Sequence, residues 1–252
     1  MPHFAANLTF LFTELPFMDR FAAASAAGFD TVEVLFPYEF SAQEMRHQLI
    51  RHGLSLALMN IPPPNWTGGN RGFAAVPGLE ERFQRDFDRA MRFADLLGPR
   101  HIHIMAGKAE GAAARQTFIE NLKWACARKP KQSFTIEPLN KIDMPGYFLN
   151  DFDLAGEIIA AVGAPNLGLQ FDAYHAHLLS GDLPALWAKH GQLTRHVQFA
   201  DAPGRGAPGS GEIDLPAFFA ALDAQGYAGY VSAEYSPNGA TPDTLGWRGG
   251  AS

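Results

Sequence analysis

Four polar side chains that could bind a cation lie where apolar, β-forming stretches end. They are Glu137 in SFTIEPLN (133–140), Asp172 in LQFDAYH (169–175), Gln198 in HVQFAD (196–201) and Glu234 in VSAEYSP (231–237). Three carboxylates and an amide oxygen form an all-oxygen set, which suits Mg²⁺ or Mn²⁺ better than zinc or copper. Asp201 is an alternative to Gln198 as the fourth ligand, and the spacing does not decide between them. The pattern predicts a site for a divalent metal.

The histidines carry less information than the carboxylates. His175 follows Asp172 by three residues, so we expect it to contact the substrate or a metal ligand. His101 and His103 alternate along one predicted strand and therefore share a face of it. His196 begins another predicted strand, and we interpret it as a structural residue.

The segment 61–78 is rich in proline and glycine and is longer than the ~2–6 residues of an ordinary strand-to-helix connection. One interpretation is a cover for a bound substrate, in which Trp66 supplies an apolar wall and Arg71 binds a substrate carboxylate. The alternative is a surface loop with a solvated arginine. Arg205 and Lys108 are competing candidates for the carboxylate anchor.

Strand-like and helix-like segments alternate along the whole chain. This α/β pattern, over 252 residues, predicts a single-domain (β/α)₈ TIM barrel that spans residues 1–252. The carboxyl ends of neighbouring barrel strands lie at one mouth, ~4.8 Å apart, so the four polar side chains should converge there. The predicted strands are 4–12, 31–36, 54–60, 101–105, 133–137, 167–172, 196–200 and 230–235, and the predicted helices are 15–28, 41–53, 77–98, 113–127, 150–163, 183–191 and 214–226.

Composition excludes several classes of function. The net charge of −6 argues against nucleic acid as a partner. Cys126 is the single cysteine, so no disulfide can form within the chain. No apolar run is long enough to cross a membrane, and the first residues lack the features of a signal peptide. These observations predict a cytoplasmic protein, and they leave its oligomeric state open between a monomer and a homo-oligomer.

At the blocks IEPLN…PGY (136–147) and HVQFADAPGRGAPGSGEI (196–213) the chain resembles the hydroxypyruvate isomerase family, part of the xylose isomerase-like TIM barrel superfamily. The resemblance extends over nearly the whole chain. It implies interconversion of hydroxypyruvate and tartronate semialdehyde through an enediolate. It also implies that Glu137 and Glu234 are the acid/base pair, and that Glu137, Asp172, Gln198 and Glu234 bind the metal.

Three alternatives remain open at this stage. Members of the same family act on other 2-oxo acids, including 2-oxo-tetronate. Ketose 3-epimerases of the superfamily usually carry histidine where this chain has Gln198. A barrel that binds a ligand without turnover is the alternative from another class, and the intact Glu137/Glu234 pair argues against it.

Overall fold

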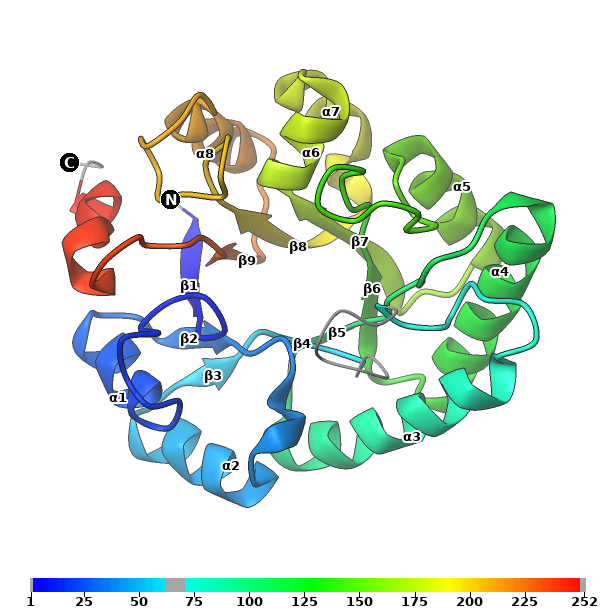
Figure 1. Cartoon of the computed structure of the whole chain (residues 1–252), viewed down its shortest axis with the longest axis horizontal. Helices are drawn as coiled ribbons and strands as arrows, with labels where there is room; N and C mark the ends of the chain where they lie inside the picture. Colours follow the sequence, from blue (N-terminus) through cyan, green and yellow to red (C-terminus); the bar gives the residue numbers. More distant parts are fainter. Residues whose placement is uncertain (1, 62–70, 250–252) are drawn as a thin grey trace.

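The strands form one parallel sheet that closes into a barrel, and the helices surround it (Figure 1). The computed structural model describes residues 2–61 and 71–249. The hydrogen-bonded order is β3-β2-β1-β9-β8-β7-β6-β5-β4. Backbone hydrogen bonds from Val34 N to Leu58 O (3.2 Å) and from Asn60 N to Leu35 O (2.8 Å) join β4 to the residues that follow β2 and so close the barrel. The predicted TIM barrel is therefore confirmed.

The elements follow the predicted alternation. The strands are β1 (His3–Asn7), β2 (Thr31–Glu33), β3 (Ser55–Leu56), β4 (Leu58–Asn60), β5 (His101–His103), β6 (Ser133–Ile136), β7 (Leu167–Asp172), β8 (Thr194–Phe199) and β9 (Tyr230–Ala233). The α-helices are α1 (Asp19–Ala26), α2 (Ala42–Arg51), α3 (Glu80–Leu97), α4 (Gly111–Arg128), α5 (Phe152–Val162), α6 (Ala173–Ser180), α7 (Leu183–His190) and α8 (Leu215–Ala224). Three short 3₁₀ segments are η1 (Pro37–Glu39), η2 (Gly191–Leu193) and η3 (Thr241–Gly249).

Two predicted strands differ most from those observed, and the others differ at most in where they begin or end. The strand predicted over 54–60 is divided at Ala57, because its first half pairs with β2 and its second half with β5. The strand predicted over 4–12 ends at Asn7, where the side-chain oxygen accepts a hydrogen bond from Thr9 N (3.0 Å) and turns the chain. Helix α6 was not predicted at all. Asp172 begins it by accepting a hydrogen bond from Tyr174 N (2.8 Å).

The barrel has a polar interior and an apolar outer layer. On β8, the side chains of His196 and Gln198 contact polar groups inside the barrel. Phe199, on the opposite face, packs on Phe219 of α8, with ring centroids 5.0 Å apart. TIM barrels usually fill their interior with branched apolar residues. Here the layer between strands and helices supplies most of the apolar core.

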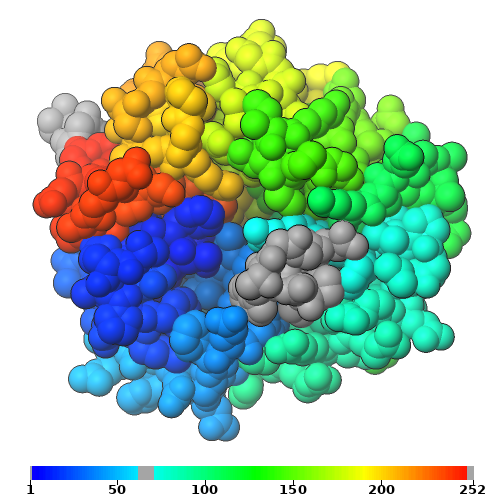
Figure 2. All heavy atoms as spheres, viewed as in Figure 1, coloured from blue at the N-terminus to red at the C-terminus, as the bar shows by residue number. Residues whose placement is uncertain are grey.

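The loops that follow the strands surround the centre of one face of the molecule. In Figure 2, dark blue atoms from the start of the chain and green atoms from its middle lie on different sides of this centre. Among the described residues no helix is both long and apolar enough to span a bilayer.

Replacement of Phe87 tests the apolar layer. Its ring is fully buried and lies 5.1 Å from the ring of Trp124 and 5.7 Å from that of Phe134. Phe87→Ala should lower the free energy of unfolding by about 3–5 kcal/mol, because it removes a buried ring and leaves a cavity. Urea denaturation measures this, with Ile50→Ala as the control because Ile50 is 67% exposed. A change of less than 1 kcal/mol in Phe87→Ala would contradict this account.

Candidate active site

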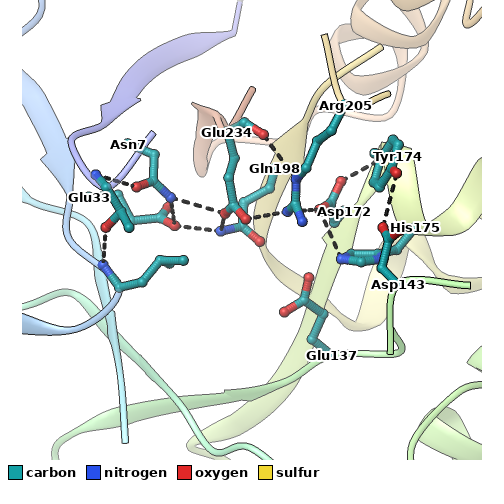
Figure 3. Close-up of polar contacts among 12 residues, drawn as sticks. Asn7, Glu33, Glu137, Asp143, Asp172, Tyr174, His175, Gln198, Arg205 and Glu234 are labelled. Atoms are coloured by element: carbon teal, nitrogen blue, oxygen red, sulfur yellow. Dashed lines mark hydrogen bonds and ion pairs between the residues drawn. The ribbon is translucent and has the colours of Figure 1, made fainter. Parts of the chain in front are cut away.

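The ends of four neighbouring strands bring the predicted polar residues to one mouth of the barrel (Figure 3). Glu137 directly follows β6, Asp172 ends β7, Gln198 lies in β8, and Glu234 directly follows β9. Gln170 connects two of them, because its Nε2 lies 2.9 Å from Glu137 Oε2 and 2.6 Å from Gln198 Oε1. Glu137, Gln198 and Glu234 line a cavity of about 440 Å³.

Arg205 lies between two of the carboxylates (Figure 3). Its Nη2 donates to Asp172 Oδ2 (3.1 Å) and to Glu234 Oε1. The guanidinium also lies over the rings of Phe10 and Tyr174, 4.9 and 5.2 Å from their centroids. Burial disfavours this charge, but Glu234 and Asp172 outweigh burial and raise the pKa of Arg205 above its usual value. Arg205 is therefore a fixed cation within the cluster.

The carboxylates of the cluster are poorly solvated. Burial, then the charges of Asp172 and Glu234, raises the pKa of Glu137 well above its usual value. Burial also raises the pKa of Glu234, and Arg205 only partly opposes this effect. Several carboxylates held in so small a buried volume repel one another, and a bound divalent cation would offset that repulsion. The donor chemistry of the cluster therefore fits a hard cation.

Two sets of ligands are candidates for a metal ion, a cluster that includes His175 and the set predicted from the sequence. Ligand atoms of Glu137, Asp172 and His175 lie within 4.8 Å of one another. However, His175 Nδ1 accepts a hydrogen bond from Asn140 N (3.1 Å), so its Nε2 carries the proton and cannot bind a metal in this tautomer. The Nε2–H group, 3.7 Å from Asp172 Oδ2, is suited to donate to a substrate oxygen. This favours Gln198 and Glu234, together with Glu137 and Asp172, as the metal ligands.

Glu33, at the end of β2, is a residue of the cluster that the sequence analysis missed. Its carboxylate accepts a hydrogen bond from Asn7 Nδ2 (2.8 Å) and another from Gln198 Nε2, and lies 2.7 Å from His196 Nε2. Burial raises the pKa of Glu33 to about 8. Gln198 donates from its amide nitrogen to Glu33 and Glu234, and its oxygen accepts a hydrogen bond from Gln170 Nε2 (2.6 Å). An acidic residue inside the apolar stretch TVEVLF was the signal that could have identified it.

Asp201, the alternative to Gln198, has a different environment. Its carboxylate accepts four backbone hydrogen bonds, and the N···O distances are 2.9–3.0 Å. The donors are Ala202, Gly209, Gly211 and Ile213. Asp201 therefore holds together the loop that carries Arg205, and its oxygens are already occupied.

The remaining predicted residues occupy different places. Arg71 lines the cavity, and its guanidinium carbon lies 5.8 Å from the ring centroid of Phe36. Lys108 is exposed and does not belong to the described residues that line the cavity. Trp66 lies outside the described residues. His103 faces the barrel interior, with Nδ1 3.4 Å from Glu137 Oε2.

Comparison with known proteins gives matches over nearly the whole chain. Residues 21–250 match the family described as Xylose isomerase-like TIM barrel. A 2-oxo-tetronate isomerase of Cupriavidus necator is 44% identical, covering 98% of this chain and 97% of its own. A hydroxypyruvate isomerase of Escherichia coli is 37% identical and covers 98% of both chains. A crystal structure described as an AP endonuclease, family 2, from Brucella melitensis is 41% identical, with a TM-score of 0.96 over 100% of this chain and 99% of that one.

Asp201→Asn tests the role of the Asp201 carboxylate. The amide cannot accept all four backbone hydrogen bonds, and each buried N–H group left without a partner costs about 1–3 kcal/mol. We expect faster hydrogen exchange at the amides of Gly209, Gly211 and Ile213, together with a lower melting temperature. Asp214→Asn, which changes only a helix cap at the start of α8, is the control. Unchanged exchange at these three amides would contradict the assignment.

Proposed function

The chain belongs to the xylose isomerase-like TIM barrel family and is an isomerase, and from this premise we propose that its substrate is a small 2-oxo acid with a hydroxyl group on the carbon next to the oxo group. The observation that carries the proposal is the position of Glu137 and Glu234 in one cavity with two arginines, Arg71 and Arg205. Carboxylates can move a carbon-bound proton, and arginines suit a substrate carboxylate.

Two substrates fit this description. Hydroxypyruvate has three carbons and would give tartronate semialdehyde. 2-Oxo-tetronate has one more carbon, and its isomerisation moves a proton between the same two positions, from C3 to C2. Relatives at 44%, 41% and 38% identity carry the name 2-oxo-tetronate isomerase, whereas one at 37% is named hydroxypyruvate isomerase and one at 40% putative hydroxypyruvate isomerase. This difference favours the four-carbon acid, and hydroxypyruvate is the second candidate.

The proposed cofactor is Mg²⁺ or Mn²⁺, held by the oxygens of Glu137, Asp172, Gln198 and Glu234. When bound, such an ion stabilises negative charge that develops on the substrate oxygens. The all-oxygen donor set and the raised pKa values of Glu137 and Glu234 support this proposal.

The protein's own groups carry the proton. One of the two glutamates removes the C3 proton of the substrate, and a proton returns at C2 from the other glutamate or from the same one. The proton of the C3 hydroxyl passes to the C2 oxygen, so that the step balances. His175, through its Nε2–H, donates a hydrogen bond to a substrate oxygen. Burial holds its pKa well below the usual value, so it stays neutral and keeps this donor. The product is the isomer in which the oxo and hydroxyl groups have changed places.

Arg71 is the proposed anchor of the substrate carboxylate. Arg205 also lines the cavity, but it already binds Asp172 and Glu234. No carboxylate within residues 2–61 and 71–249 forms an ion pair with Arg71, so its charge is available. The negative net charge and the acidic cluster disfavour a nucleic-acid substrate, whatever the name of the Brucella relative.

Conservative replacement of each glutamate tests the proton transfer. Glu137→Gln and Glu234→Gln should each lower kcat by at least 10²-fold, since an amide cannot exchange a proton with carbon. Incubation with hydroxypyruvate or 2-oxo-tetronate in D₂O, with Mg²⁺ or Mn²⁺, measures deuterium uptake at C3 by NMR. The exposed Glu212 provides a matched control in Glu212→Gln. Near-normal uptake in either of the first two variants would remove that glutamate from the mechanism.

The same assay ranks the substrates. A higher kcat/KM for 2-oxo-tetronate would support the four-carbon assignment, and the reverse order would make hydroxypyruvate the preferred substrate. Turnover that is unchanged after removal of divalent metal with a chelator would contradict the proposed cofactor. No uptake from either acid by the metal-loaded protein would contradict the proposed substrate class.

Replacement of Arg71 tests the anchor. Arg71→Ala should raise KM by about 10-fold or more and change kcat less, because a charged hydrogen bond to a carboxylate contributes about 1.5–3 kcal/mol. Steady-state kinetics measure both constants. Lys108→Ala should leave KM unchanged, because Lys108 lies outside the cavity. A raised KM in the lysine variant alone would reverse the assignment.

A further inference from the structure

A second cavity, of about 330 Å³, lies at the opposite end of the barrel, where the strands begin. Arg100 precedes β5, Arg195 lies at the start of β8, and the segment 225–229 leads into β9. The side chains of Gln192 and Gln225 also line the cavity. None of the described residues that line it is acidic, although the chain as a whole carries a net charge of −6.

The two arginines of this cavity are held in place without carboxylates. Arg100 lies over the ring of Tyr230, 5.3 Å from its centroid. Arg195 donates to the carbonyl oxygen of Pro165 and lies against Gly168, where a Cβ atom would come within 2.4 Å of the arginine Cδ. Neither guanidinium has an ion-pair partner in the described part of the chain, whereas Arg115 pairs with Glu157 at 2.9 Å. Both charges are therefore available to a ligand.

The inner wall of the cavity carries two buried ring nitrogens that have no hydrogen-bond partner among the described residues. His101 is 5% exposed, its Nδ1 lies 2.8 Å from Ser133 Oγ, and its Nε2 has no hydrogen-bond partner among the described residues. The indole nitrogen of Trp187 also has no hydrogen-bond partner among the described residues. Burial, with contributions from His196 and then Arg100 and Arg195, lowers the pKa of His101 to about 3. His101 is therefore neutral, and the positive charge of the cavity comes from the arginines.

We propose that this cavity binds a small phosphate monoester. Two guanidinium groups match the oxygens of a phosphate dianion, and the side-chain amides of Gln192 and Gln225 can donate further hydrogen bonds. The volume exceeds that of one phosphate, so a short carbon skeleton fits beside it. The site is separate from the candidate active site, because it lies at the other end of the barrel.

Binding can be measured on the full-length protein with two probes, inorganic phosphate and glycerol 3-phosphate. We expect saturable binding by isothermal titration calorimetry, with glycerol 3-phosphate the tighter ligand, and a shift of the imidazole ¹⁵N resonances of His101. Arg100→Gln and Arg195→Gln should each weaken binding by 10-fold or more. Arg195→Lys, which keeps the charge, should weaken it less than Arg195→Gln does.

Two control variants locate the binding site. Arg92→Gln changes an exposed arginine of α3 outside the cavity, and Arg71→Ala changes the active-site arginine. Both should bind the probes as the unchanged protein does. Loss of binding in Arg71→Ala alone would place the phosphate in the active site and overturn the proposal. Equal binding of the probes by all variants, or binding that does not saturate at matched ionic strength, would also overturn the proposal. Tartrate serves as a dianion without phosphate, and tighter binding of tartrate than of glycerol 3-phosphate would overturn it too.

Discussion

Burial of four carboxylates at one mouth of the barrel is the constraint on which the rest of the structure depends. An ion buried without partners costs several kcal/mol, so each carboxylate requires donors or a cation nearby. Asn7 donates to both Glu33 and Glu234, at 2.8 and 3.0 Å. Arg205 joins Asp172 to Glu234. The barrel interior is polar because it supplies these partners, and the apolar core lies instead between strands and helices.

Several residues of the site have two structural roles. Asp172 ends β7, caps α6 through Oδ1 and faces Arg205 through Oδ2. Asp201 anchors the loop that positions Arg205 on the same cluster. Because the cap and the loop are held by backbone N–H groups, the charged side chains are placed by the fold itself. Such fixed placement is what acid/base chemistry in a buried cavity needs.

The two mouths of the barrel differ in charge but share its interior. At the carboxyl ends of the strands the cluster is acidic, and at the other end two arginines line a cavity without acids. Between them His101 and His196 stand with ring centroids 5.9 Å apart, and His196 lies 2.7 Å from Glu33. Polar side chains therefore occupy the barrel interior between the two cavities.

The sequence by itself determined the order of strands and helices, because hydrophobic periodicity and glycine or serine caps are local signals. Ser41 caps the start of α2, and Gly98 caps the end of α3. It also predicted that Glu137 and Glu234 lie at one mouth, because each follows a strand and the carboxyl ends of all strands in a parallel barrel meet there.

Only the tertiary structure decided which groups face each other. The predicted strand 31–36 places Glu33 in its middle, whereas the observed strand β2 ends at Glu33. The partners of Glu33, Asn7 and His196, are distant from it in the chain. The different environments of Gln198 and Asp201 also depend on the fold, because backbone N–H groups of the loop after β8 donate to the Asp201 carboxylate. Burial, pairing and side-chain direction depend on contacts between remote segments, and local patterns carry no record of those contacts.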